Sequence, residues 1–190
     1  MVLWDPNRDH DARRYEKPAD FFRALKKCHA SGKGYRVALT PPKPSPDMFE
    51  DWCAALWAVL DGHHLTYAIA EEYGAVCRNA GGIDVQRDEN HYLCWTQGRK
   101  FGLVWQATSQ RPQSISKDAL ENAGIIYAGS MGTLAAKRVG AEIEVDAKAL
   151  RATQRGNFWY WDTGMLRAEE RHIFTPDDSH GTEKKIIRPN

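Results

Sequence analysis

Hydrophobic positions along the chain fall into short apolar runs separated by segments with helical spacing. The short runs are typical of buried strands, and they are Val2–Trp4, Tyr35–Leu39, Leu65–Ala70, Leu103–Thr108, Ile125–Ala128 and Gly156–Trp161. Apolar residues at helical spacing predict helices over Pro18–Cys28, 46–61, His91–Gln97, Ser114–Asn122, Gly132–Val139 and Val145–Leu150. Because strands and helices alternate, the sequence predicts an α/β fold with a mostly parallel sheet and helices on both faces.

The segments between these elements are read as turns and loops. Residues 7–17 are polar and predict a loop. Gly81-Gly82 and the charged run Arg87–Asn90 predict an exposed, mobile loop. Ser45 and Pro46 are typical of a helix start, because a serine caps free N–H groups and proline suits the first helical position.

Composition limits the domain count and the class of partner. The chain has 190 residues, of which 42% are hydrophobic and 27% are charged, as in one ordinary domain with a substantial core. We expect that domain over residues 1–165 and a polar tail over 166–190, in which Ile186-Ile187 could dock on a partner. The net charge of +1 gives no global basic field, so contact with nucleic acid would need a local patch or an oligomeric ring.

Cysteine spacing and hydropathy exclude two further classes of protein. The four cysteines, Cys28, Cys53, Cys77 and Cys94, form no C-x-x-C pair and have no histidines at metal-finger spacing, so we expect reduced, half-buried thiols and no zinc site. We assign no chemistry to the histidines. No stretch approaches the roughly 18 apolar residues of a membrane span, and the cytoplasm is the expected location.

Two strand ends carry the candidate chemistry. The run Leu65–Ala70 is followed by Glu71 and Glu72, and paired acids at a strand end can hold a metal and polarise a water beside a phosphate. The segment Gly98–Pro112 delivers a glutamine and an arginine to the end of a second strand. Taken alone, such a pair of acids more often begins a solvated loop, and it is the Gln110-Arg-Pro112 segment that makes a catalytic role an equal alternative.

The residues in these segments resemble the FtsK/HerA group of P-loop ATPases, which are DNA-translocating and DNA-packaging motors, and look closest to small phage-encoded members. The resemblance runs from Val2 to about Thr163. It rests on a strand ending in Asp-Pro, an acidic strand, the segment Gly98-Arg-Lys-Phe-Gly102 and the segment Ala107-Thr-Ser-Gln-Arg-Pro112. The resemblance implies a P-loop NTPase core of the RecA type.

The resemblance assigns roles to four side chains. Glu71 matches the metal-holding acid of the Walker B strand, where most relatives have aspartate, and Glu72 matches the general base that orients the attacking water. Gln110 matches the sensor glutamine. Arg99 matches an arginine that reaches across a subunit interface to stabilise phosphate charge, with Lys100 and Arg111 as competitors.

The sequence departs from the family at the phosphate loop. Such a loop reads G-x-x-x-x-G-K-[ST], and no such pattern occurs in the 190 residues. The nearest pattern, Ser31–Tyr35, follows a predicted helix and is read as a helix stop. Family topology places the strand that feeds the loop between the sensor strand and the last strand. We therefore expect a core without its first strand and phosphate loop, in which the last strands close the gap, a partner fills it, or the printed chain begins downstream of the natural start.

Three functions are consistent with these features. The first is a DNA-translocating or packaging motor component from a phage or prophage, acting as a hexameric ring on double-stranded DNA with ATP and Mg²⁺. The second is a degenerate, non-hydrolysing relative that acts through protein partners. The third, a plain nucleic-acid-binding protein using Arg99, Lys100 and Arg111, is disfavoured by the near-neutral charge.

Overall fold

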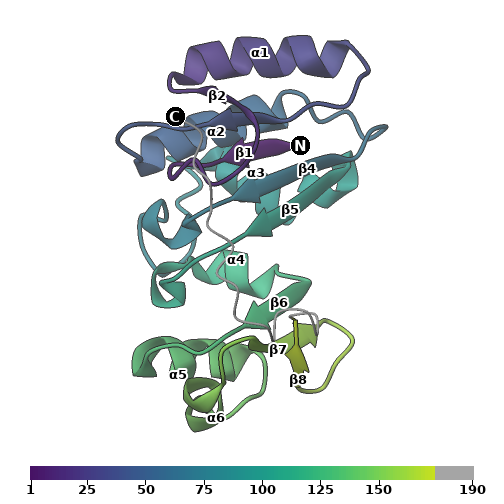
Figure 1. Cartoon of the computed structure of the whole chain (residues 1–190). Coiled ribbons are helices and arrows are strands. Elements are labelled where there is room, and N and C mark those ends of the chain that lie inside the picture. Colours follow the sequence, from purple (N-terminus) through teal and green to yellow (C-terminus); the bar gives the residue numbers. More distant parts are fainter. Residues whose placement is uncertain (174–190) are drawn as a thin grey trace, which may run out of the picture. The chain divides into compact units, whose positions relative to one another are not determined.

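The computed structural model describes residues 1–173 and divides the chain into two compact units, Met1–Ala123 and a second unit beginning at Gly124 (Figure 1). The predicted Ile186-Ile187 docking segment lies outside the described residues.

The elements of the first unit are β1 (Val2–Trp4), β2 (Arg13–Tyr15), α1 (Pro18–Ala30), β3 (Val37–Leu39), α2 (Pro46–Trp57), β4 (Thr66–Ala70), η1 (Tyr73–Ala75), α3 (Glu89–Thr96), η2 (Gly98–Phe101), β5 (Leu103–Ala107), η3 (Pro112–Ser114) and α4 (Lys117–Glu121). Those of the second unit are β6 (Ile125–Ala128), α5 (Thr133–Glu142), α6 (Ala147–Ala152), β7 (Asn157–Asp162) and β8 (Glu169–His172).

The first unit contains a five-stranded sheet in the order β2-β3-β1-β4-β5, and every pair in it is parallel. The register places Trp4 beside Ala70 and Ala70 beside Ala107. The carboxyl ends of β1, β4 and β5 therefore reach the same edge of the sheet. The predicted α/β fold with a parallel sheet is confirmed.

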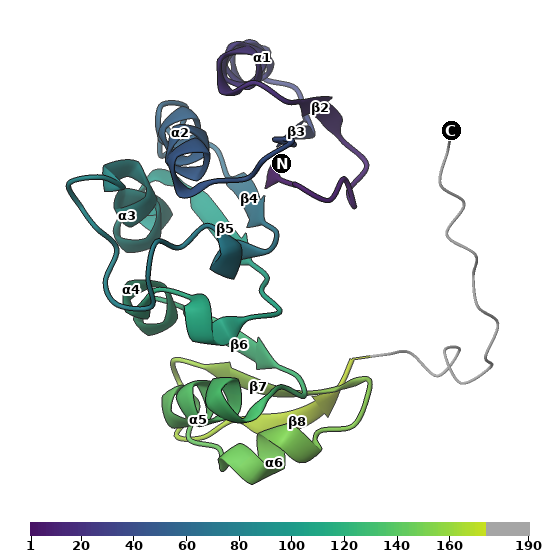
Figure 2. The same ribbon diagram turned by 90° about the vertical axis from the view of Figure 1, so that its left-hand side faces the viewer.

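The main core of this unit lies on one face of the sheet. Val2 and Trp4 alternate with Leu3 along β1 and pack in one cluster with Phe21 of α1 and Trp52 of α2. Figure 2 shows α2 and α3 side by side on this face. Ser45 caps α2 as predicted, because its hydroxyl accepts a hydrogen bond from the backbone N–H of Met48 at 3.2 Å.

Strand β5 ends the sheet, and among residues 1–173 no strand pairs with its outer edge. The two predicted strands that follow it, β6 and β7, pair with each other in a separate sheet. The expectation that the last strands might close the sheet is therefore wrong for the described residues. An open edge leaves a row of backbone N–H and C=O groups without ladder partners.

The second unit is a three-stranded antiparallel sheet, β6-β7-β8, with α5 and α6. Ala136, Ile143 and Leu150 of this unit form its own small core with Ala128 of β6. The periodicity of the sequence indicated β6, β7, α5 and α6 but not that the two strands belong to a sheet of their own. Strand β8 lies within residues 166–190, which the sequence predicted as a tail.

Three local expectations differ from the structure. Arg13–Tyr15 form strand β2 inside the predicted loop 7–17, because an edge strand needs backbone pairing but no apolar run. Helix α2 ends at Trp57 and does not extend to Gly62. Asp88, predicted in an exposed loop, is buried. No helix in the described part of the chain has the length and apolar character to cross a bilayer.

Candidate active site

Glu71 follows β4 directly and is held from both sides. One carboxylate oxygen lies 2.8 Å from Nε2 of His10, and the other accepts a hydrogen bond from the Thr108 hydroxyl. The backbone N–H of Glu71 donates to the carbonyl of Trp4 at 3.0 Å. Its side chain keeps 20% of its surface exposed. Loops after three neighbouring strands thus converge on one half-buried carboxylate.

His10 reaches Glu71 because Asp5 shapes the loop after β1. Asp5 is fully buried, and its two carboxylate oxygens accept hydrogen bonds from the backbone N–H groups of Asp9, at 2.8 Å, and His10, at 3.2 Å. A buried carboxylate needs such donors to offset its lost hydration. The Asp-Pro pair that supported the family resemblance therefore has a structural role here, since Asp5 orders the turn that carries His10.

Glu72 sits in a left-handed turn beside a pocket. Its backbone has φ 50°, a region that costs a non-glycine residue about 1–3 kcal/mol unless its surroundings hold it. The next residue provides that hold, since the N–H of Tyr73 donates to the carbonyl of Thr108 at 2.8 Å. Glu72, Gln110 and Arg111 line one open pocket of about 340 Å³ together with Trp4.

Gly74 lets the turn after Glu72 approach residues 109–111, the segment that contains Gln110 and is called the sensor segment below. A Cβ built at this position would lie 2.6 Å from Oγ of Ser109 and 2.9 Å from the carbonyl oxygen of Arg111. Any side chain would therefore push apart the two segments that carry Glu72 and Gln110. The glycine is required here by close approach and not by a positive φ.

A buried polar cluster anchors Tyr73 beneath the pocket. The Tyr73 hydroxyl lies 2.5 Å from Nε2 of His91 and accepts a hydrogen bond from Nε1 of Trp95 at 2.9 Å. Burial raises the pKa of Tyr73, and burial with the nearby Arg78 lowers the pKa of His91 to about 3. At neutral pH the phenol therefore keeps its proton and shares a hydrogen bond with a neutral imidazole.

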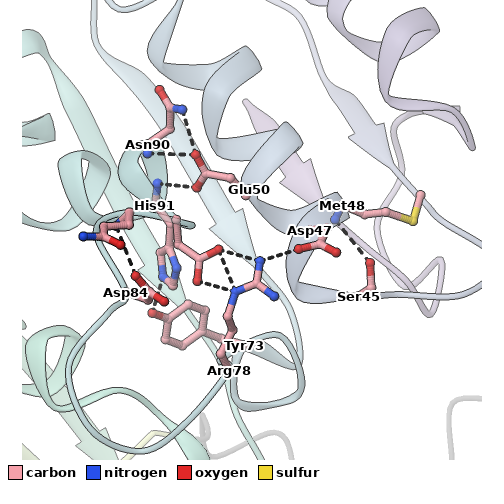
Figure 3. Close-up of polar contacts among 11 residues, drawn as sticks. Ser45, Asp47, Met48, Glu50, Tyr73, Arg78, Asp84, Asn90 and His91 are labelled. Carbon is pink, nitrogen blue, oxygen red and sulfur yellow. Dashed lines mark hydrogen bonds and ion pairs between the residues drawn. The ribbon is translucent and has the colours of Figure 1, made fainter.

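The start of α3, which carries His91, is fixed from α2. The two carboxylate oxygens of Glu50 accept hydrogen bonds from the backbone N–H groups of Asn90 and His91, each at 2.9 Å (Figure 3). An acid at a helix start satisfies free N–H groups and suits the helix dipole. The Arg78 guanidinium forms an ion pair with the buried Asp88, in which Nε lies 2.8 Å from Oδ2, and it also contacts Asp47.

Arg99 is remote from the other three predicted site residues. It is exposed and lies in η2, before β5, whereas Gln110 follows β5. The five residues of β5 span roughly 16 Å at about 3.3 Å per residue. The structure thus brings Glu71, Glu72 and Gln110 to one end of the sheet and places Arg99 at the other. Of the competitors, Arg111 lines the pocket and Lys100 lies beside Arg99 in η2.

Sequence reasoning missed His10, Thr108 and the Tyr73–His91 pair. Thr108 had a signal, because it ends the predicted strand Leu103–Thr108 and lies two residues before Gln110. His10 had only a weak one, since ten residues of polar sequence do not reveal that Asp5 folds the loop back. His91 gave none, because a lone histidine in a helix pattern is compatible with exposure as well as burial.

Comparison with known proteins locates this arrangement in a known fold. The structure matches the genome packaging NTPase B204 from Sulfolobus turreted icosahedral virus 2 in complex with ATP-γS, with a TM-score of 0.69 and 13% identity over 92% of this chain and 82% of that one. The chain has the fold of a viral packaging NTPase. The sulfate complex of B204 matches the packaging-NTPase fold equally well, with a TM-score of 0.68, 14% identity, and coverage of 92% and 81%.

The chain also has a sequence relative encoded by a phage. Protein P9 of Pseudoalteromonas phage PM2 is 24% identical over 184 residues, covering 92% of this chain and 78% of P9. No family model matches the chain. The resemblance to FtsK/HerA-type packaging NTPases that the sequence indicated is confirmed.

Proposed function

We propose that the chain is a component of a viral DNA-packaging or DNA-translocating ATPase that acts in the host cytoplasm. The observation that supports this most is the convergence at the carboxyl end of the parallel sheet, where Glu71 meets His10 and Thr108, while Glu72 and Gln110 share a pocket. Ligands of open α/β sheets bind at this edge. The likeness to a packaging NTPase and to a phage protein supports the same assignment.

Each residue has a distinct role in this proposal. Glu71 holds a cation through a carboxylate that His10 and Thr108 keep oriented. Glu72, on its left-handed turn, accepts the proton of an attacking water, and Gln110 contacts the terminal phosphate from the same pocket. Arg99 acts on the nucleotide of a neighbouring subunit, since its own site is a strand length away.

Magnesium fits the donors that the site provides. Mg²⁺ prefers carboxylate and hydroxyl oxygens and keeps several waters, and Glu71, Glu72 and Thr108 supply such oxygens. Bound Mg²⁺ would neutralise charge on the β- and γ-phosphates of ATP. His10 would keep Glu71 in place through its hydrogen bond while the carboxylate contacts the cation or its waters.

The alternative is a non-hydrolysing module that acts through protein partners. Its support is the sequence, in which no phosphate-loop pattern occurs. In this case the sheet edge and the pocket would serve assembly, and Glu72 would have no chemical role.

Calorimetric titration of the chain with ATP and Mg²⁺, followed by a hydrolysis assay, separates the two. The motor proposal predicts binding, and hydrolysis that Glu72→Gln abolishes while binding persists. Glu121→Gln is the matched control, because this acid only pairs with Lys117 on α4. Equal turnover in Glu72→Gln and the parent would remove Glu72 from the mechanism, and absence of nucleotide binding would favour the non-hydrolysing module.

A further inference from the structure

Two histidines and an aspartate lie together at the amino end of the parallel sheet, opposite the end that carries Glu71 and Glu72. His29 comes from the last turn of α1, and Asp61 and His64 come from the turn between α2 and β4. Oδ2 of Asp61 lies 3.4 Å from Nε2 of His29 and 2.7 Å from Nδ1 of His64. The three donor atoms all lie within 4.8 Å of one another.

These distances are close to those of a tetrahedral metal site. A zinc–nitrogen bond of about 2.0–2.1 Å implies neighbouring ligand atoms about 3.3 Å apart. The 3.4 Å between Asp61 and His29 matches that spacing, and the 2.7 Å between Asp61 and His64 needs to open by about 0.6 Å. The two histidine nitrogens lie within 4.8 Å of one another and need to close by up to about 1.5 Å. Because imidazole and carboxylate donors suit Zn²⁺ and related divalent transition metals, the donor chemistry is consistent with the geometry.

The turn that carries two of the donors is ordered by its own backbone. The second oxygen of Asp61, Oδ1, accepts hydrogen bonds from the N–H groups of His63, at 2.8 Å, and His64, at 2.9 Å. Gly62 takes a φ of 72° and donates its N–H to the carbonyl of Phe101 at 3.1 Å. Oδ2 is thereby left facing the two rings, and its position does not depend on their hydrogen bonds alone.

We propose that His29, Asp61 and His64 bind a divalent transition metal ion of the Zn²⁺ class, with water completing the coordination. The site is separate from the proposed nucleotide pocket of the same chain, because it lies at the amino end of the sheet and Glu71 lies at the carboxyl end. Through Gly62 and Phe101 it is attached to η2, the segment that carries Arg99. Bound metal would fix α1 and this segment to one turn.

Titration of the full chain with ZnCl₂, in the absence of nucleotide, tests the proposal. We expect one saturable site. His29→Ala, His64→Ala and Asp61→Asn should each weaken zinc affinity by more than about ten-fold, because each removes a direct ligand and the loss of a group that only hydrogen-bonds to a ligand already costs about ten-fold. His63→Ala is the matched control, because this exposed neighbour lies outside the cluster. It should bind zinc like the parent.

A second readout needs no variant and so does not depend on how the substitutions fold. In the parent chain, zinc should shift the imidazole NMR signals of His29 and His64 and leave those of His63 unchanged. A Co²⁺-loaded chain should show the absorption bands of a four-coordinate site. Absence of saturable zinc binding, or equal shifts at His63 and His64, would overturn the proposal. The ATP titration described above is unaffected by either result.

Discussion

The two ends of the five-stranded sheet differ in burial, charge and the number of elements that support them. At the carboxyl end, Glu71 is half-buried, receives contacts from the loops after β1 and β5, and is followed by the buried Tyr73. At the amino end, Arg99 and Lys100 are exposed on a short turn. The carboxyl end holds Glu71 between two loops, whereas the amino end exposes Arg99 and Lys100 on η2.

Proximity along the sequence is therefore a poor guide to proximity in a site. Arg99 and Gln110 belong to one continuous segment, yet β5 separates them by its full length. Glu71 and His10 are 61 residues apart and touch. A parallel sheet collects the residues that follow its strands and separates them from those that precede the same strands. A role for Arg99 in hydrolysis therefore requires a second copy of the chain.

The largest expected effect comes from removing Arg99. If it completes a neighbour's site, Arg99→Ala should lower hydrolysis by about 10³-fold or more without weakening nucleotide binding in its own subunit. Mixing Arg99→Ala with Glu72→Gln should restore activity, because some interfaces then pair an intact arginine with an intact acid. Lys100→Ala is the control and should remain active. If the mixture were as inactive as each variant alone, Arg99 of one subunit would not complete the site that contains Glu72 of the next.

The next effect concerns the buried support of the carboxyl end. Arg78→Met would leave the buried Asp88 without its partner, and breaking a buried pair from one side costs about 3–5 kcal/mol. Urea unfolding should show this loss of free energy. Arg87→Met, an exposed arginine in the same segment, should change it by less than about 1 kcal/mol. Equal stabilities of the two variants would contradict a structural role for the Arg78–Asp88 pair.

Much of the fold was predictable because its signals are local. The apolar runs of β1, β4 and β5 and the Ser45-Pro46 start of α2 each identify an element without knowledge of the rest. Strand β2 was not predictable, because its pairing with β3 depends on the backbone and its side chains are two arginines and a tyrosine. Membership of β6 in a separate sheet was likewise hidden, since periodicity shows that a strand exists but not which strand it pairs with.

The candidate site was predictable only where strand ends carry the chemistry. Glu71, Glu72 and Gln110 each follow a strand, so a parallel sheet brings them to one edge. Their supports were not predictable, because His10 depends on the fold of the Asp5 loop and His91 on burial beneath Tyr73. The remoteness of Arg99 follows from its place before β5. Its catalytic role stays a prediction, as do those of the other three.

The pH dependence of stability should report the buried His91. Its pKa in the fold is about 3, below the ordinary value of about 6.5, so the unfolded chain binds the proton more readily between these values. Stability is then full above pH 6.5 and falls as the pH drops toward 3, by up to about 1.4 kcal/mol per pH unit. The free energy of unfolding, measured in urea at several pH values between 7 and 5, should fall less steeply with decreasing pH in His91→Asn than in the parent. In His63→Asn it should fall as steeply as in the parent. If the free energy of unfolding of His91→Asn depended on pH as steeply as that of the parent, His91 would not be the source of the pH dependence.

The smallest expected effect is a displacement within the carboxyl end. Gly74→Ala introduces a methyl group 2.6 Å from the Ser109 hydroxyl and 2.9 Å from the Arg111 carbonyl oxygen. The hydroxyl can rotate away but the carbonyl is part of the backbone, so the sensor segment must shift, at a cost of about 1–3 kcal/mol. Thermal unfolding should show the loss, and backbone NMR shifts should change at Gln110 more than at Arg99. Gly34→Ala, where a Cβ meets no atom within 4 Å, is the matched control and should leave both ends of the sheet unchanged. Shifts of equal size at Gln110 and Arg99 would show instead that the two ends respond as one body, and that the carboxyl end is not the separately supported structure inferred from its contacts.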